Sequence, residues 1–304
     1  MTIRFDNRVA IVTGAGNGLG RAHALLLASR GAKVVVNDPG GAVDGKGGGH
    51  AAADKVVDEI KAAGGQAVAN YDSVADAKAA ANIVKTAVDS YGTVDIVVNN
   101  AGVLRDVIFH KMTEKDWDIV RSVNLDGYFY MSRAAAPFFK DQGSGAYVHM
   151  TSTSALIGNM GQANYSAAKL GVVGLSKSIA IDMQRFGVRS NCISPFAFTR
   201  MVGTIPANTP ENERRLEVAK RMTPDKIAPV AVFLLSEAAG KVNGQIFAVR
   251  ANEVFLMSQS RPLRSIHRDG GWTPEQLAER LPGAFAAQFY PLAVSADVFA
   301  WDPI

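Results

Sequence analysis

Short runs of β-branched and other apolar residues alternate with longer amphipathic stretches from the N-terminus to about residue 250. Runs that are apolar throughout are typical of strands buried on both faces of a parallel sheet, and the stretches between them place apolar residues at helical spacing. The predicted strands are 8–13, 33–37, 67–70, 94–99, 145–151, 188–193 and 245–249, and the predicted helices are 20–30, 51–63, 75–90, 114–140 and 163–186. The pattern predicts an α/β fold, with a doubly wound, seven-stranded parallel sheet and helices on both faces.

The alternation stops near residue 250, which suggests a main domain and a tail. We expect residues 1–250 to form a Rossmann-type, dinucleotide-binding catalytic domain. Residues 251–304 then form a C-terminal extension that packs on the same domain or on a partner subunit, so the protein is a single domain overall. Within the main domain, the glycine-rich stretch 39–49 is predicted to be a loop, and 199–225, rich in Thr, Pro and charge, a flap.

The extension carries its own helix signal and several aromatic residues. The run from Thr273 to Gln276 is a capping box with Pro274 at the first helical position, so we expect a helix to start there. We expect the aromatic side chains of the tail to be buried against the main domain or a partner subunit. They are Trp272, Phe285, Phe289, Tyr290, Phe299 and Trp301.

Composition narrows the class of protein. A chain of 304 residues with 48% hydrophobic content is long enough for a large core, which excludes general disorder. The net charge of +4 comes without a dense basic run, which argues against nucleic acid as a partner. The single cysteine, Cys192, follows Asn191 in an apolar run and is interpreted as a core residue, so no intrachain disulfide is expected.

Metal sites, membrane spans and targeting signals are not expected. The histidines show no ligand spacing, so we predict no structural metal. No apolar stretch approaches the roughly 20 residues of a membrane helix, and we find no signal peptide or C-terminal targeting tripeptide. The cytoplasm is therefore the expected location.

A glycine-rich turn after the first predicted strand is the first candidate site. Glycines there let the backbone approach a pyrophosphate, and the following helix N-terminus offers free N–H groups and a favourable dipole. The candidate residues are Gly14, Asn17, Gly18, Leu19 and Gly20. Asp38 ends the second strand, where a carboxylate accepts hydrogen bonds from the adenine ribose and repels a 2′-phosphate, which favours NAD over NADP. The alternative is that Asp38 is a turn residue before Pro39.

A second motif follows the fourth predicted strand and resembles that of a known protein family. The run Asn99-Asn100-Ala101-Gly102 follows the fourth strand, and together with the turn from Thr13 to Gly20 it resembles the short-chain dehydrogenase/reductase family. The resemblance implies that this run supports the sheet and lines the adenosine side of the cofactor. It also implies that Asp72 and Ser73 hold the adenine ring; a helix N-cap near Val74 is compatible with that role.

The catalytic candidates match the same family. Tyr165 and Lys169 lie one helical turn apart, and an ammonium beside a phenol, together with the positive nicotinamide, is expected to lower the phenol pKa from about 10 toward the working range. The tyrosine then acts as general acid/base. The resemblance implies that Ser152 hydrogen-bonds the substrate oxygen and that Asn124 holds a water of a proton relay; the alternative for Asn124, an asparagine that satisfies a helix backbone carbonyl, occurs together with that role in the family.

The loop after the sixth strand departs from the family pattern. Pro195 and Thr199 correspond to residues over the nicotinamide, but Phe196 stands where most members have glycine, and the threonine comes one position early.

The substrate is suggested by a closer resemblance. The stretches around 37–38, 51–57, 69–74, 104–106 and 158–169 resemble the (3R)-hydroxyacyl-CoA dehydrogenase unit of the peroxisomal multifunctional enzymes of type 2, which implies a freestanding relative that oxidises a (3R)-3-hydroxyacyl-CoA to the 3-oxoacyl-CoA. The main alternative is a hydroxysteroid dehydrogenase. An NADPH-dependent 3-oxoacyl-carrier-protein reductase fits Asp38 poorly, and a non-catalytic NAD-binding regulator fits the intact catalytic residues poorly. Members of the family are usually dimers or tetramers, so a homodimer or homotetramer is expected.

Two further sets of residues are candidates for substrate contacts. Six apolar or aromatic residues are candidates for the lining of an acyl or steroid slot, and ordinary packing in the core and flap is an equal alternative for them. They are Tyr128, Phe129, Phe196, Phe198, Met201 and Val202. A basic cluster of the tail is a candidate for the CoA phosphates, with a solvated face or a subunit contact at least as plausible. It consists of Arg261, Arg264, His267 and Arg268.

Overall fold

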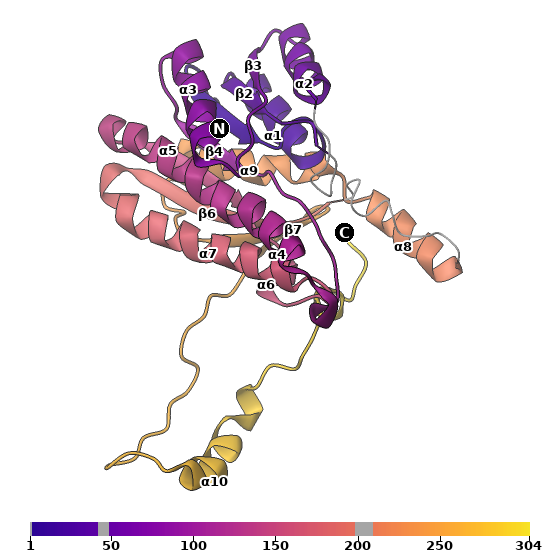
Figure 1. Ribbon diagram of the computed structural model, residues 1–304, viewed down its shortest axis with the longest axis vertical. Helices are drawn as coiled ribbons and strands as arrows, with labels where there is room; N and C mark the ends of the chain where they lie inside the picture. The colour runs from indigo at the N-terminus through magenta and orange to yellow at the C-terminus, as the bar shows by residue number, and fades with distance from the viewer. Residues whose placement is uncertain (1, 42–48, 198–208) are drawn as a thin grey trace.

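The computed structural model describes residues 2–41, 49–197 and 209–304. Its strands form one sheet in the order β3-β2-β1-β4-β5-β6-β7-β8, with helices on both faces (Figure 1). The strands are β1 (Val9–Thr13), β2 (Lys33–Asn37), β3 (Gln66–Asn70), β4 (Ile96–Asn99), β5 (Gly145–Met150), β6 (Val188–Phe196), β7 (Ile246–Arg250) and β8 (Glu253–Leu256). The helices of the first half are α1 (Gly18–Ser29), α2 (Ala51–Ala62), α3 (Ala77–Tyr91), α4 (Glu114–Arg121) and α5 (Gly127–Gln142). Those of the second half are α6 (Thr153–Leu156), α7 (Ala163–Met183), α8 (Pro210–Lys220), α9 (Ala228–Leu235), α10 (Pro274–Phe285) and α11 (Ser295–Val298).

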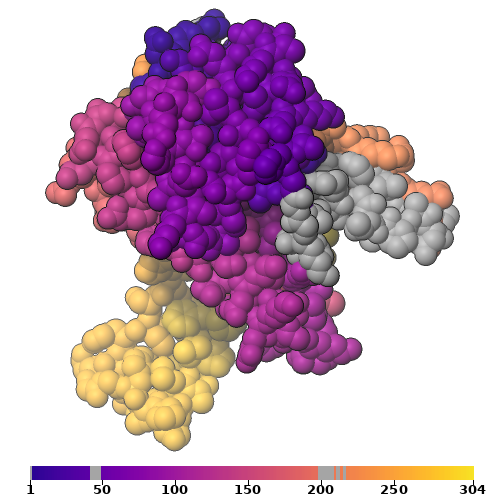
Figure 2. Space-filling model, turned by 45° about the horizontal axis from the view of Figure 1, so that its top comes forward, coloured from indigo at the N-terminus to yellow at the C-terminus, as the bar shows by residue number. Residues whose placement is uncertain are grey.

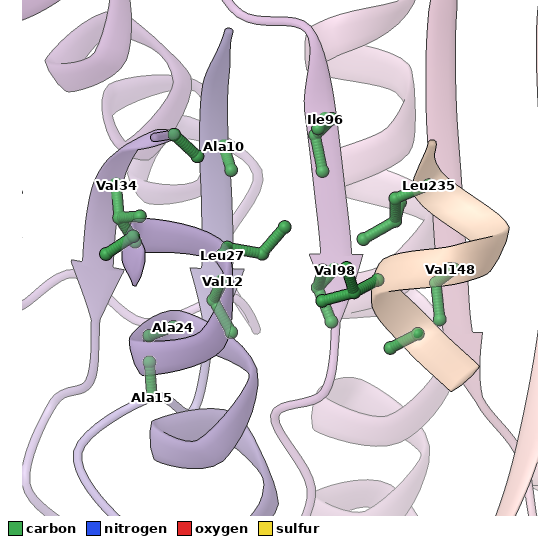
Figure 3. Packing of buried hydrophobic residues seen from close by; sticks show 14 of the residues in the cluster. Ala10, Val12, Ala15, Ala24, Leu27, Val34, Ile96, Val98, Val148 and Leu235 are labelled. Carbon is green, nitrogen blue, oxygen red and sulfur yellow. The ribbon is translucent and has the colours of Figure 1, made fainter. Parts of the chain in front are cut away.

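The central strand β1 shows why both faces are covered. Its five residues are all buried, and successive side chains of a strand point to opposite faces. Ala10 and Val12 join a core cluster with Leu27 of α1 and Leu235 of α9 (Figure 3), whereas Ile11 belongs to the cluster on the other face, which α3 and α5 cover. The predicted doubly wound fold is confirmed.

The sheet differs from the prediction at one edge. All seven predicted strands are present and pair in parallel, and β6 continues beyond its predicted end to Phe196. An eighth strand, β8, pairs antiparallel with β7 and was not predicted. Its exposure alternates between half-buried and exposed, so it lacks the fully apolar run of the inner strands.

The helix expected over residues 114–140 is built in three parts. A π-helical turn, Ser122–Asp126, separates α4 from α5. The short helices α6, α8, α9 and α11 lie outside the predicted ones. The π turn places Asn124 in the interior, and such turns occur often at functional sites.

The extension leaves the main body after β8 and carries α10 away from the sheet before it returns to α11 (Figures 1 and 2). The predicted capping box is present, since the Thr273 hydroxyl accepts from the Gln276 amide at 3.3 Å and the Gln276 side chain accepts from the Thr273 amide at 3.1 Å. The Phe299 ring packs against Phe196 at 4.9 Å between centroids. Phe289 is exposed in the single chain, as Tyr290 is, and their contact with a partner subunit stays a prediction.

The described residues hold no helix that is long and apolar enough to cross a membrane. Among the same residues, no group of three or more His, Cys, Asp or Glu side chains is arranged to hold a metal ion. Several predicted features lie outside the described residues. They are Thr199, Phe198, Met201, Val202 and positions 42–48 of the glycine-rich loop.

Candidate active site

The carboxyl ends of the parallel strands bring the predicted site residues to one edge of the sheet. β1 pairs with β2 and β4, and β4 pairs with β5, all in parallel. The loops that follow these strands therefore open on the same side, which is where open α/β sheets bind ligands. This edge carries the glycine-rich turn, Asp38, the Asn99–Gly102 run and Ser152.

The glycine-rich turn has the backbone geometry that only glycine adopts easily. Gly14 has φ of +61° and Gly18 of +53°, in the left-handed region that side chains disfavour. A Cβ on Gly20 would lie 2.2 Å from the carbonyl oxygen of Gly14. α1 starts directly afterwards with Asn17 at its N-cap, so Leu19 and its neighbours present a helix N-terminus to a phosphate.

The turn is tied to the loop after β4 by a residue that the sequence reasoning missed. The Thr13 hydroxyl accepts from the backbone amides of Asn100 at 3.0 Å and Ala101 at 3.1 Å. The Asn100 side chain donates to the carbonyl oxygens of Thr13 at 2.9 Å and Gly14 at 3.1 Å. The position of Thr13, directly before the first glycine, was the available signal.

Asn99 has a different place from its neighbour in the same motif. Its side chain is buried and donates to the Ser132 hydroxyl at 3.0 Å, and its amide nitrogen lies 3.1 Å from His149 Nδ1. Asn99 therefore joins β4 to α5 and β5 inside the core, which fits the predicted support of the sheet.

Asp38 lies against the glycine-rich turn. Its carboxylate accepts from the backbone amides of Gly16 at 2.8 Å and Gly40 at 2.7 Å. A Cβ on Gly16 would lie 2.8 Å from Asp38 Oδ2. The carboxylate is thus fixed at the end of β2 beside the turn, in the position that suits recognition of a ribose diol next to a pyrophosphate.

The predicted adenine-side pair follows β3. The Asp72 carboxylate accepts from the side-chain amides of Asn70 at 2.9 Å and Asn82 at 2.6 Å. The Ser73 hydroxyl accepts from the Ala75 amide at 3.2 Å. The N-cap of α3 is Asp76 rather than a residue near Val74, because the Asp76 side chain accepts the amide of the first helical turn.

Ser152, Tyr165 and Lys169 meet at the end of β5. Ser152 is the N-cap of α6, its hydroxyl donates to that of Ser154 at 3.1 Å, and its effect on Tyr165 is to lower the pKa of the phenol. Tyr165 and Lys169 lie on α7, with Lys169 Nζ 5.8 Å from the centre of the Tyr165 ring. Thr151 supports the group by donating to the Lys169 carbonyl at 2.8 Å.

Burial dominates the protonation of this pair. It raises the pKa of Tyr165 to about 12, against the lowering effect of the Ser152 hydrogen bond and with a raising effect from Asp106. Burial also lowers the pKa of Lys169 to about 7. The expected lowering of the phenol pKa is therefore absent in the chain by itself, because desolvation of the buried phenolate is the largest effect.

Asn124 is held by the backbone of the loop after β4. Its side chain donates to the Val103 carbonyl at 2.9 Å and accepts from the Val103 amide at 2.8 Å. A Cβ on Gly102 would lie 3.3 Å from Asn124 Oδ1 and 3.8 Å from Lys169 Nζ. Asn124 and Lys169 therefore face the same small space beside Gly102, and the backbone group that Asn124 binds belongs to a loop residue rather than to a helix.

A family profile described as Enoyl-(Acyl carrier protein) reductase matches residues 14–251. Over 249 residues the chain is 50% identical to a short-chain type dehydrogenase/reductase of Mycobacterium tuberculosis, covering 82% of this chain and 84% of the relative. The chain belongs to the short-chain dehydrogenase/reductase family. As a member of this family it is an oxidoreductase.

Other relatives of this short-chain dehydrogenase/reductase have more specific names. The peroxisomal multifunctional enzyme type 2 of Mus musculus is 45% identical, over 91% of this chain but 36% of its own length. The hydroxyacyl-CoA dehydrogenase ChsB1 of Mycobacterium tuberculosis is 38% identical, over 94% of this chain and 91% of the relative. The predicted resemblance to the multifunctional enzymes is confirmed.

Solved structures agree with the fold. A short-chain dehydrogenase from Mycobacterium avium superposes with a TM-score of 0.82 at 38% identity, covering 95% of this chain and 98% of the other. A 7α-hydroxysteroid dehydrogenase, solved with NADH and 7-oxo glycochenodeoxycholic acid, gives a TM-score of 0.73 at 33% identity, covering 82% and 94%.

The candidate substrate slot of the dehydrogenase is only partly assembled from the predicted residues. Tyr128 is 1% exposed and packs in the core beneath α7, so its assignment to the slot is wrong. Phe129, the next residue of α5, is 48% exposed. Pro195 and Phe196 end β6 and are half-buried. The tail cluster is exposed on the extension and makes no part of this site in the described single chain; it is Arg261, Arg264, His267 and Arg268.

Proposed function

We propose that the enzyme oxidises a secondary alcohol to a ketone with NAD⁺, and that the alcohol is a (3R)-3-hydroxyacyl-CoA. The observation that carries the proposal is the grouping of Ser152 with Tyr165 and Lys169: Ser152 lowers the pKa of the Tyr165 phenol, and Lys169 Nζ lies 5.8 Å from the Tyr165 ring centre, one turn farther on α7. This group lies at the same sheet edge as the glycine-rich turn. A proton acceptor thus stands beside a site suited to a dinucleotide.

The residues present fit NAD. At the glycine-rich turn only backbone can lie next to a pyrophosphate. A side chain on Gly16 would meet Asp38, and Gly14 and Gly18 have left-handed φ angles. The Asp38 carboxylate suits the free ribose hydroxyls and repels a 2′-phosphate. The similar hydroxysteroid dehydrogenase, solved with NADH, supports the same choice.

Each catalytic residue has a role in moving one proton. The Ser152 hydroxyl hydrogen-bonds the substrate oxygen, and Tyr165, as the phenolate, takes the hydroxyl proton of the alcohol and becomes the neutral phenol. The glycine-rich turn and Asp38 would hold NAD⁺, which would supply the hydride acceptor and a positive charge next to Tyr165. The Lys169 ammonium stabilises the phenolate, and Asn124 keeps the space beside Gly102 open for a proton relay.

The substrate class rests on the named relatives. A multifunctional enzyme of type 2 and a hydroxyacyl-CoA dehydrogenase cover most of this chain. A hydroxysteroid is the second candidate, because the solved 7α-hydroxysteroid dehydrogenase holds a bile-acid ketone. NADH formation should be measured with (3R)- and (3S)-hydroxyacyl-CoA of several lengths and with secondary steroid alcohols, using NAD⁺ and NADP⁺ side by side. Turnover of steroids alone would replace the acyl-CoA assignment.

The role of Tyr165 is tested by Tyr165→Phe. We expect kcat to fall by roughly 10² to 10⁴-fold while NADH still binds, because only proton transfer is removed. Tyr91→Phe, at the end of α3, is the matched control. Undiminished turnover of Tyr165→Phe would refute the mechanism, and full biological activity without turnover would favour a regulator.

We also propose a homodimer or homotetramer. The outer faces of α5 and α7 expose Phe129, Leu170 and Ile181, which are 48%, 52% and 76% exposed. Apolar side chains grouped on neighbouring helices favour association. Sedimentation equilibrium would show a monomer if this is wrong, and cell fractionation would test the expected cytoplasmic location.

A further inference from the structure

A second phenol lies directly beneath the catalytic lysine. Tyr128, on α5, is 1% exposed, and Lys169 Nζ donates a hydrogen bond to its hydroxyl at 2.8 Å. The same nitrogen lies 4.4 Å from the centre of the Tyr128 ring, compared with 5.8 Å for Tyr165. The ammonium therefore contacts the hydroxyl of Tyr128, and its distance from the ring centre follows from that contact.

The Lys169 ammonium makes a second hydrogen bond, to the backbone of β5. Lys169 Nζ also donates to the Met150 carbonyl, at 2.8 Å. An ammonium has three N–H donors, so two are occupied by α5 and β5 and one remains. Tyr165 lies one turn earlier on the same helix, with its ring centre 5.8 Å from Lys169 Nζ.

The titratable neighbours of Lys169 stay neutral near pH 7. Burial raises the pKa of Tyr128 well above 10, lowers that of His149 to about 3 and raises that of Cys192 to about 11. These groups come from α5, β5 and β6, and Tyr165 faces the lysine from α7 itself. Since no anion stands among these described neighbours, the ammonium depends on the neutral acceptors Tyr128 and Met150 for its stability.

We propose that Tyr128 is a positioning residue, which holds the Lys169 ammonium through its hydroxyl so that the remaining N–H serves Tyr165. The proposal rests on the proposed catalytic role of Lys169. Tyr128 itself does not touch the reacting atoms, because it lies in the core with Val172 and Cys192.

The test is Tyr128→Phe, which keeps the ring and its packing and removes only the acceptor. Tyr147→Phe is the matched control: Tyr147 is equally buried, its ring lies 5.8 Å from His149 as that of Tyr128 lies 6.1 Å away, and its hydroxyl donates to the Ser132 carbonyl at 2.9 Å instead of contacting Lys169. Any general effect of removing a buried hydroxyl should appear in both variants.

Two readouts are measured over pH 5 to 11. The first is the titration of the Lys169 side chain by NMR in protein with 13C-labelled lysine, assigned with Lys169→Met; it requires neither substrate nor turnover. The second is kcat with the best substrate of the panel. Losing an acceptor for a charged donor should lower the lysine pKa by about one to two units and reduce kcat at pH 8 to 9 by roughly tenfold or more.

The outcomes separate cleanly. A lowered lysine titration in Tyr128→Phe, with Tyr147→Phe like the wild type, supports the positioning role. An unchanged titration, or an equal shift in both variants, overturns it. If the wild type turns over no substrate of the panel, the proposed function fails, and the NMR titration still decides whether Tyr128 holds the ammonium.

Discussion

The buried ion pair that anchors the C-terminus offers a stability test with a built-in control. Arg250, at the end of β7, is 3% exposed and donates through Nε to the Glu253 carboxylate at 2.9 Å. Its Nη1 donates to the carbonyl oxygens of Phe299 at 3.1 Å and Trp301 at 2.8 Å. The guanidinium also lies 4.6 Å from the Trp301 ring. Arg250 thus connects the last residues of the chain to the β7–β8 hairpin.

The variant Arg250→Ala should lower the free energy of unfolding by about 3 kcal/mol, near the lower end of the 3–5 kcal/mol typical of broken buried pairs. The lower end is expected because the Glu253 carboxylate keeps a hydrogen bond from the Trp301 indole at 2.8 Å. Replacing both partners, as Arg250→Met with Glu253→Leu, should restore most of the loss, since no charge is then left buried and unpaired.

The control is an exposed ion pair between α8 and the C-terminal segment. Arg214 and Asp302 lie 3.3 Å apart with side chains 76% and 56% exposed, and Arg214→Ala should cost less than about 1 kcal/mol. Urea unfolding measures the loss in the free energy of unfolding for each of the two variants. An Arg250→Ala loss no larger than that of Arg214→Ala would refute the reasoning.

The same pair predicts a pH dependence. Burial raises the pKa of Glu253, but hydrogen bonds from Trp301 and Arg250 outweigh it, so the pKa lies below its usual value. A lowered folded-state pKa adds stability above the unfolded-state pKa and loses it as pH falls through the folded-state value. The wild type should therefore lose this contribution below about pH 4.3, whereas the double variant has none to lose.

Three further variants test the cofactor site and the core. Asp38→Ser should weaken the preference for NAD⁺ over NADP⁺ by at least about tenfold in kcat/KM, because the carboxylate that repels a 2′-phosphate is gone; an unchanged ratio contradicts its role. Gly20→Ala should abolish measurable NADH binding by fluorescence, since the new Cβ would lie 2.2 Å from the Gly14 carbonyl oxygen; tight binding would show that the turn relaxes. His23→Leu should stabilise the protein more at pH 5 than at pH 8, because the imidazole is buried with neither ring nitrogen hydrogen-bonded among the described residues, and its pKa is lowered to about 4. A neutral buried histidine contributes stability above its unfolded-state pKa and loses it as pH falls toward 4, so equal effects at both pH values would exclude this cause.

Most of the fold was readable from the sequence because its signals are local. The apolar run of β1, the glycines of the following turn and the capping box at Thr273 each depend on a few neighbouring residues. β8 was missed because its half-exposed alternation resembles a loop or edge segment, and its pairing partner β7 is what makes it a strand.

Part of the candidate site was also predictable from the sequence, and the rest depends on the tertiary structure. The sequence by itself determined that Tyr165 and Lys169 share a helix face and that Asp38 ends the second strand, since helix period and strand length set those positions. The tertiary structure alone decided that the lysine binds Tyr128 and Met150, and that burial raises the phenol pKa. Both results depend on how α5, β5 and α7 pack together. These elements are far apart in the chain, so the local sequence pattern of any one of them does not predict which of its atoms become buried.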